Sequence, residues 1–174
     1  YLVNHKRYVN RFPWQRGKKQ KPRNFVDADH AGCPRTRKSS TGGCAFWGRH
    51  CIGTVSMTQN LVSLSSGESE FYAAGSAASR GLETLHIMEE CGVKMQLQVH
   101  SDSSAARSTC ARTGVGRTRH LETRWMWIQE KMRKEEVQIV KEDTMLNLAD
   151  IGTKAHEAPR IQQLLSMTSY GKPW

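Results

Sequence analysis

Apolar and polar residues along this chain follow two spacings, one typical of strands and one typical of helices. Alternation or short apolar runs predict strands near residues 24–29, 44–47, 52–57, 97–102 and 137–139. Turn-forming residues between the second and third of these favour a hairpin. Three strands thus precede the main helix, and the later strands alternate with helices. This order predicts an α/β protein with a mixed sheet flanked by helices.

The longest predicted helix begins after Ser65. Ser65 and Glu68 have the S-x-x-E spacing of a capping box, in which the hydroxyl and the carboxylate satisfy free amides at a helix start. The apolar residues that follow recur every three or four positions: Phe71, Ala74, Ala78, Leu82, Leu85 and Met88. Gly92 is expected to end this helix. Shorter helices are predicted near 105–110 and 121–132, and in a tail that opens at residue 148 and restarts at Pro159.

Positive charge is concentrated at the start of the chain. Of the 26 Lys and Arg residues eight lie in residues 1–24, which contain none of the 16 acidic residues, so the rest of the chain carries only +2 of the net +10. We call residues 1–23 the basic arm. A basic arm on a nearly neutral body predicts a polyanionic partner, and Tyr8, Phe12 and Trp14 within it are able to stack on bases. The alternative is a solvated linker.

Length, cysteines and hydropathy exclude several classes of protein. The 174 residues suffice for one domain with a buried core. The five cysteines are odd in number and form no C-x-x-C pair, which supports neither a zinc site nor a disulfide framework and favours free thiols in a reducing compartment. No apolar run approaches 18 residues, so no membrane span is expected. The chain lacks an initiator Met, and we expect it to be a piece of a longer protein.

Acidic residues occur where predicted strands end or helices begin. Asp27 and Asp29 close the first strand, Glu70 lies in the first turns of the long helix, Asp102 ends the fourth strand and Asp150 starts the last helix. At about 6 Å and an effective dielectric near 20, each ionised pair costs roughly 3 kcal/mol, so a fold that gathers them needs cations. Two divalent ions activate water and stabilise the leaving oxygen of a phosphodiester, and Mg²⁺ prefers such oxygen ligands. Scattered strand-end acids are the alternative.

Six segments resemble, in the same order, the ribonuclease H region of copia-type retroelements. They are residues 25–32 (FVDADHAG), 37–43 (RKSSTGG), 64–71 (LSSGESEF), 99–105 (VHSDSSA), 117–121 (RTRHL) and 147–154 (NLADIGTK). The resemblance implies a ribonuclease H-like fold with a five-stranded mixed sheet and helices on its faces. It implies two-metal hydrolysis of the RNA strand of RNA/DNA hybrids, with Mg²⁺ or alternatively Mn²⁺.

The same resemblance implies the setting of the domain. Residues 1–23 are expected to be the tail of a reverse transcriptase connection, residues 24–157 the ribonuclease H-like domain and residues 158–174 a C-terminal helical tail. The reverse transcriptase portion of the same polyprotein is an expected partner, and no membrane is. An intracellular place is implied, in a cytoplasmic virus-like particle or the nucleus.

Site roles transfer position by position. Asp27, Glu70, Asp102 and Asp150 match the catalytic, metal-binding acids, with Asp29 as the alternative to Asp27. Glu68 is explained by the capping box, which favours Glu70 as the ligand. For Asp150 the alternative is a helix N-terminal acid favoured by the helix dipole. Contacts to nucleic acid are expected from the basic turns: Arg37, Lys38, Arg117, Arg119 and His120. For His120 we expect a phosphate or packing contact rather than general-base catalysis.

Departures from the family pattern keep two other functions open. His30, Ser103 and Gly152 replace a Trp, an Asn and an aromatic residue, and the loop 140–146 lacks a His, which leaves Glu142 or Asp143 for product release. The chain is then either a nuclease or a decayed module that binds nucleic acid without turnover. An integrase-like nuclease has the same fold and acids, but the sequence motifs around the acids favour ribonuclease H.

Overall fold

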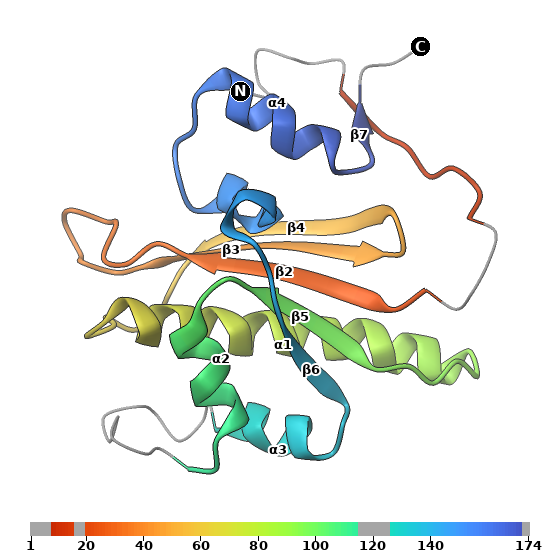
Figure 1. Cartoon of the computed structure of the whole chain (residues 1–174), viewed down its shortest axis with the longest axis horizontal. Helices are drawn as coiled ribbons and strands as arrows, with labels where there is room; N and C mark the ends of the chain where they lie inside the picture. The colour runs from red at the N-terminus through yellow and green to blue at the C-terminus, as the bar shows by residue number, and fades with distance from the viewer. Residues whose placement is uncertain (1–7, 16–19, 115–125, 172–174) are drawn as a thin grey trace.

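The computed structural model describes residues 8–15, 20–114 and 126–171. Its centre is one five-stranded sheet in the order β4-β3-β2-β5-β6 (Figure 1). The strands are β2 (Pro22–Ala28), β3 (Ser40–Trp47), β4 (His50–Thr58), β5 (Leu97–Ser101) and β6 (Val137–Lys141). The first three are antiparallel, whereas β5 runs parallel to β2 and β6 parallel to β5. The predicted mixed sheet is therefore present.

Helices cover both faces of this sheet. On one face lies the long α1 (Ser66–Glu90), with α2 (Ser104–Ala111) and α3 (Trp127–Arg133) beside it. On the other lie the 3₁₀ turn η4 (Leu148–Gly152) and α4 (Ala158–Ser166), preceded by η3 (Thr144–Leu146). The tail predicted to open at residue 148 is thus a 3₁₀ turn, and Asp150 lies inside it rather than at the start of the last helix.

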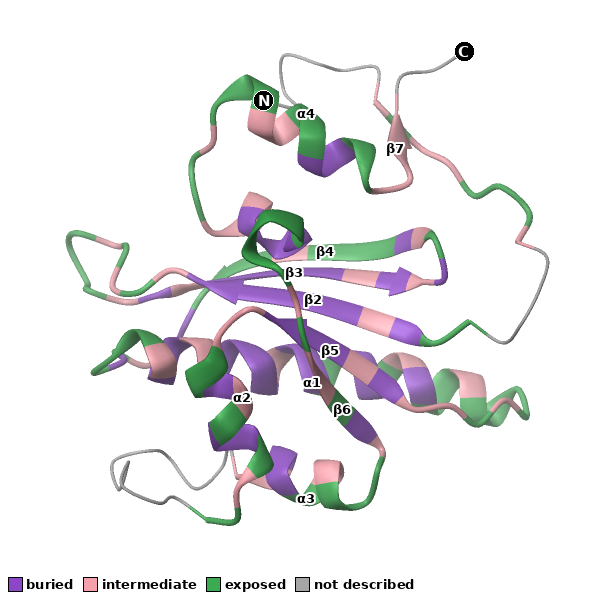
Figure 2. Ribbon diagram, in the orientation of Figure 1, coloured by how far each residue is buried: buried purple, intermediate pink, exposed green. Residues whose placement is uncertain are grey.

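The alternation within β2 divides the core into two clusters. Val26 faces α1 and packs with Phe71, Ala74 and Leu97, whereas Phe25 packs on the opposite face with residues of η4 and α4. Because successive side chains of a strand point to opposite faces, a central strand covered on both faces is buried along its whole length. In Figure 2 β2 and β5 are each buried except for one half-buried residue, whereas the edge strand β4 is largely exposed. None of the helices in the described ranges combines the length and the apolar character needed to cross a bilayer.

The described part of the basic arm lies on the body. β1 (Val9–Asn10) pairs with β7 (Tyr170–Gly171) near the C-terminus. The Asn10 side chain donates to the Cys51 carbonyl at 2.9 Å, and the Gln15 side chain donates to the Trp47 carbonyl at 3.1 Å. Residues 8–15 therefore lie alongside the β3–β4 hairpin. The strand β2 begins at residue 22, within the basic arm. The boundaries drawn at 23/24 and 157/158 remain predictions.

Candidate metal centre

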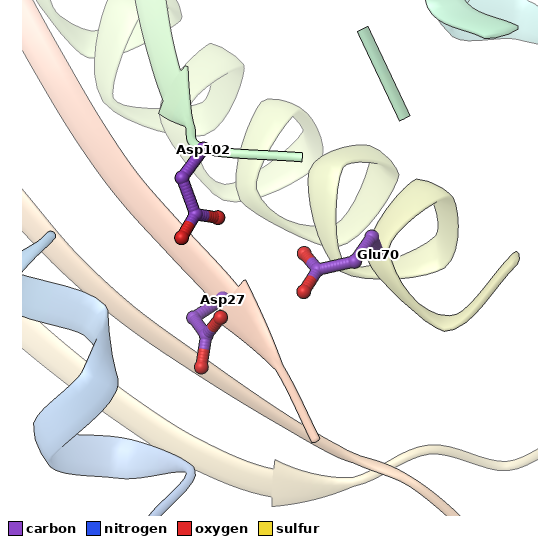
Figure 3. A group of neighbouring side chains, drawn as sticks. All are labelled: Asp27, Glu70 and Asp102. Atoms are coloured by element: carbon purple, nitrogen blue, oxygen red, sulfur yellow. The ribbon is translucent and has the colours of Figure 1, made fainter. Parts of the chain in front are cut away.

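Three carboxylates meet at one end of the central strands (Figure 3). Asp27 lies near the end of β2, Asp102 directly follows the neighbouring parallel strand β5, and Glu70 reaches them from the start of α1. One ligand oxygen of each lies within 4.8 Å of those of the other two. We call these three residues the acid triad. Parallel neighbours end on the same edge of a sheet, which is why strand-end acids 75 positions apart in sequence (27 and 102) become neighbours.

Glu70 occupies the least favourable position of the three for a charge. Its Oε1 accepts a hydrogen bond from the Ala28 amide at 3.3 Å, whereas Oε2 is buried and has no hydrogen-bond partner among the described residues. Burial, and then the charges of Asp27 and Asp102, raise the pKa of Glu70 to about 8, against the Ala28 amide, which lowers it. A buried oxygen without a donor is costly, and a hard divalent cation with oxygen ligands satisfies it. The donor set therefore fits Mg²⁺ or Mn²⁺.

Glu68, two positions earlier, is engaged in the helix start. Its amide donates to the Ser65 hydroxyl at 3.2 Å, and its carboxylate accepts from the Leu64 amide at 2.7 Å and from the Tyr72 hydroxyl at 2.5 Å. The predicted capping box is thus present, with the carboxylate on the amide of Leu64 rather than Ser65. The Glu68 carboxylate is therefore bound to the start of its own helix, and Glu70 is the acid of α1 that faces Asp27 and Asp102.

Asp27 is 2% exposed and faces the η4 side of the sheet. Burial raises its pKa, while the hydroxyl of Thr153 and the ammonium of Lys154, 3.2 Å away, oppose that rise. Asp29, the alternative ligand, lies outside the triad. Its carboxylate accepts a hydrogen bond from the Ser40 amide and so stabilises the β2–β3 turn.

Asp150 lies on the far side of Asp27 from Glu70's helix and outside the triad. Its Oδ1 is 2.9 Å from the Lys154 ammonium and its Oδ2 is 3.4 Å from the Arg160 guanidinium. Lys154 also contacts Asp27, so one lysine joins the two aspartates. The expected fourth acid is thus beside the site, with both carboxylate oxygens paired to cations. Its role as a metal ligand stays a prediction.

Two residues that the sequence did not single out hold η4 against the sheet. Asn147 is fully buried, donates to the Val26 carbonyl at 2.9 Å and accepts from the Ala149 amide at 3.2 Å. Gly42 is opposite Asp27 in the register, and a Cβ there would lie 2.4 Å from the Ala149 carbonyl oxygen. Both contacts let η4 approach Asp27 closely. The only sequence signal for Asn147 was its place at the head of the 147–154 segment.

Two of the residues expected to contact nucleic acid lie within the described part of the chain. Arg37 and Lys38 lie in the β2–β3 loop, which leaves the sheet at the end where Asp27 lies. Arg37 is exposed there, with a φ of 57°. Arg117, Arg119 and His120 lie outside the described residues.

Two of the family departures and both candidate product-release acids have structural partners. Ser103 is the N-cap of α2 and accepts from the Ala106 amide at 3.2 Å. Gly152 lies so close to Gly42 that a Cβ would come within 3.0 Å of its Cα. Glu142 pairs with the ring of His100 at 2.7 Å, whereas Asp143 caps η3. His30 is exposed, and nothing in the structure explains that substitution.

Comparison with known proteins supplies homologues and a fold. A scan against protein-family models finds no match. The retrovirus-related Pol polyprotein from transposon TNT 1-94 of Nicotiana tabacum is 32% identical over 132 residues, which are 75% of this chain and 10% of the polyprotein. An uncharacterized mitochondrial protein of Arabidopsis thaliana is 44% identical over 55 residues, 32% of this chain and 23% of that protein. The chain therefore spans less than a quarter of either relative.

Among solved structures, LC11-RNase H1, isolated from compost, has a TM-score of 0.58 at 18% identity and covers 84% of this chain and 99% of that one. The same enzyme in complex with an RNA/DNA hybrid has a TM-score of 0.56 at 16% identity, over 76% of this chain and 94% of that one. A homologue of this chain is thus a retrovirus-related transposon Pol polyprotein, and the fold of this chain is that of ribonuclease H domains. The relationship to retroelement polyproteins and the ribonuclease H-like fold, both expected from the six segments, are confirmed.

Proposed function

We propose that this chain is the ribonuclease H domain of a copia-type retrotransposon polyprotein and hydrolyses the RNA strand of RNA/DNA hybrids. The observation that carries the proposal is the acid triad, which gathers Asp27, Glu70 and Asp102 at the end of β2 and β5 on this fold. A solved neighbour with the same fold binds an RNA/DNA hybrid. The intact triad favours an enzyme over a decayed binding module.

The proposed site contains two Mg²⁺ ions, with Mn²⁺ as an alternative, held by the acid triad and Asp150. Bound divalent ions would activate a water and stabilise the leaving oxygen of the phosphodiester. The chain's own groups set the conditions for this. Glu70 must lose its proton, which its raised pKa opposes and a neighbouring cation favours. Asp150 must release at least one of its two cationic partners before it presents a free oxygen.

Substrate binding is assigned to the basic surfaces. Arg37 and Lys38 lie in the loop that follows the Asp27 end of β2, and the basic arm adds charge that attracts phosphates. Arg117, Arg119 and His120 are proposed from the sequence alone. The reverse transcriptase portion of the same polyprotein is the proposed partner, and the proposed place is a cytoplasmic virus-like particle or the nucleus.

Incubation with a labelled RNA/DNA hybrid, with Mg²⁺ or with EDTA, tests the activity. We expect Mg²⁺-dependent cleavage of the RNA strand, lost by several orders of magnitude in D27N, E70Q, D102N and D150N, because each removes a charge from the ion-binding group. E68Q is the matched control in the same helix turn, since a Gln also closes a capping box.

The outcomes separate the functions. Hybrid binding without Mg²⁺-dependent cleavage would support the decayed binding module. Cleavage of duplex DNA in preference to the hybrid would support an integrase-like nuclease. Loss of activity in E68Q with E70Q still active would show that the wrong acid of α1 had been assigned.

A further inference from the structure

The cations around Asp150 differ in how firmly they are held. The Arg160 side chain is 18% exposed and also donates to the carbonyls of Met145 and Thr144, at 2.8 and 3.4 Å. The Lys154 side chain is 44% exposed, and the partners of its ammonium are the carboxylates of Asp27 and Asp150. Arg160 is therefore fixed by backbone acceptors as well, whereas within the described residues the Lys154 ammonium is held by the two carboxylates, and its greater exposure lets it move into water.

The charged form of Lys154 is stabilised by the two neighbouring aspartates. Partial burial lowers its pKa, but the hydrogen bond and charge of Asp150 and the charge of Asp27 outweigh that effect and leave the pKa raised. The ammonium is 3.2 Å from Asp27 and 2.9 Å from Asp150, so it occupies the space between two groups that otherwise repel each other. It thus supplies, from the chain itself, the positive charge that a cation would supply between these aspartates.

The charge balance of the site follows from its residues. The acids are Asp27, Glu70, Asp102 and Asp150, and their ion-pair partners within the described residues are Lys154 and Arg160. With all four acids ionised, two negative charges remain after these pairs are counted. One divalent cation neutralises them. A second would leave a partly buried site with two excess positive charges, which is costly without an added anion such as a phosphate.

We propose that Lys154 is a displaceable counter-ion on the Asp27–Asp150 side of the site, so that the substrate-free chain binds one divalent cation and not two. The inference rests on the metal site of the proposed function and adds to it the residue that sets the number of ions. The single cation binds at the acid triad, where the unpartnered Glu70 Oε2 lies. The second requires that Lys154 leave the two aspartates.

Calorimetric titration of the full chain with MnCl₂ tests this, at a pH above that at which Glu70 ionises. We expect one Mn²⁺ per wild-type chain. We expect K154M to bind two, or to bind the first about tenfold or more tightly, because a cation 3.2 Å from Asp27 no longer competes. The matched control is K94M, which makes the same charge change at an exposed lysine that pairs with Glu89.

A second pair of variants covers the case in which K154M does not fold because two buried aspartates lose their partner. In D150N and D150N/K154M one of those charges is already absent, and the comparison isolates the effect of Lys154 on Asp27. We expect the double variant to bind one Mn²⁺, about tenfold or more tightly than D150N.

The results distinguish failure of this inference from failure of the metal site. Two Mn²⁺ ions in the wild type, or equal affinity and stoichiometry in wild type, K154M and K94M, would overturn the role of Lys154 and leave the metal site standing. Binding in K154M but not in the wild type would overturn the expected single cation of the wild type, since the lysine would then exclude both ions. Absence of Mn²⁺ binding in both would overturn the metal site and the inference together.

Discussion

Glu70 illustrates how one residue links pH, metal and stability. Its carboxyl is partly buried beside two aspartates, and one of its oxygens is buried without a donor. In the metal-free chain, protonation of this carboxyl removes both the cost of burying a charge and the repulsion from the two aspartates. A bound divalent cation would have the same effect, and protons and cations therefore compete for Glu70.

This competition predicts a pH-dependent stability. The pKa of Glu70 rises from 4.5 to about 8 on folding, so the stability that it contributes is complete below about pH 4.5 and is lost as the pH rises to about 8. We expect the metal-free wild type to lose about 1–3 kcal/mol across that window, less than the full shift implies because water still reaches the carboxyl. Thermal melts in EDTA between about pH 5 and 8.5 measure it.

E70Q is the reference, because its loss of the titrating group flattens the profile. Asp27, whose pKa burial also raises, changes stability in the same direction. His100, whose pKa burial lowers, changes it in the opposite one, and both remain in E70Q. Parallel profiles for wild type and E70Q would contradict the assignment of the raised pKa to Glu70.

Among the elements, the short η4 turn has the most direct effect on the site. It rests on the sheet through Asn147, whose side chain bonds the Val26 carbonyl and the Ala149 amide. It places Asp150 and Lys154 next to Asp27. We expect N147A to lower the free energy of unfolding by about 1–3 kcal/mol, since it leaves buried polar groups without partners.

The same variant should also lower hybrid cleavage, because η4 is then no longer held in place against the sheet beside Asp27. Urea unfolding and cleavage rates measure the two effects. S103A, which removes the N-cap of α2 without touching η4, is the matched control and is expected to cost about 1 kcal/mol with a smaller change in rate. Unchanged cleavage in N147A would show that η4 does not position the site.

The basic arm is a second element with a separable role. Its residues 8–15 make hydrogen bonds to the β3–β4 hairpin, so deleting them would change both the charge and the packing. Replacing Arg16, Lys18, Lys19 and Lys21 by Gln removes four charges and leaves those bonds in place. We expect weaker hybrid binding and a shallower salt dependence, because fewer counterions are released, with little change in cleavage of saturating hybrid. An unchanged salt slope would make the arm a linker.

For the whole molecule, the acids predict opposite effects of one mutation with and without metal. Asp102 belongs to the triad, so D102N relieves repulsion in the metal-free chain, by about 1–2 kcal/mol. We expect its melting temperature in EDTA to exceed that of the wild type. Millimolar Mg²⁺ should stabilise the wild type through binding linkage and the variant much less.

Calorimetric melts of both proteins, with Mg²⁺ and with EDTA, measure this. E68Q is again a suitable comparison, since its carboxylate bonds its own helix start rather than the triad. A D102N chain that is less stable in EDTA and still responds fully to Mg²⁺ would show that the three acids do not share one site.

Much of the fold followed from local pattern. Alternation within 24–29 and 137–139, the capping box at Ser65 and the apolar stripe from Phe71 each reflect forces between residues near in sequence. The five strands of the central sheet and α1 are where they were expected, whereas the short β1 and β7 were not predicted. The six segments, taken together, identified the polyprotein homologues and the ribonuclease H fold. The boundaries differ by a few residues, since strand ends depend on neighbours that pair with them.

The sequence by itself determined the type of fold, the homologues and the set of candidate metal-binding acids, because periodicity, capping and sequence motifs are local properties. Only the tertiary structure decided how those acids are divided. It gathered Asp27, Glu70 and Asp102, turned Asp29 to a backbone amide, and paired Asp150 with Lys154 and Arg160. The physical reason is that electrostatic interactions depend on distance and burial, which residues far apart in sequence acquire only when the sheet and η4 pack together.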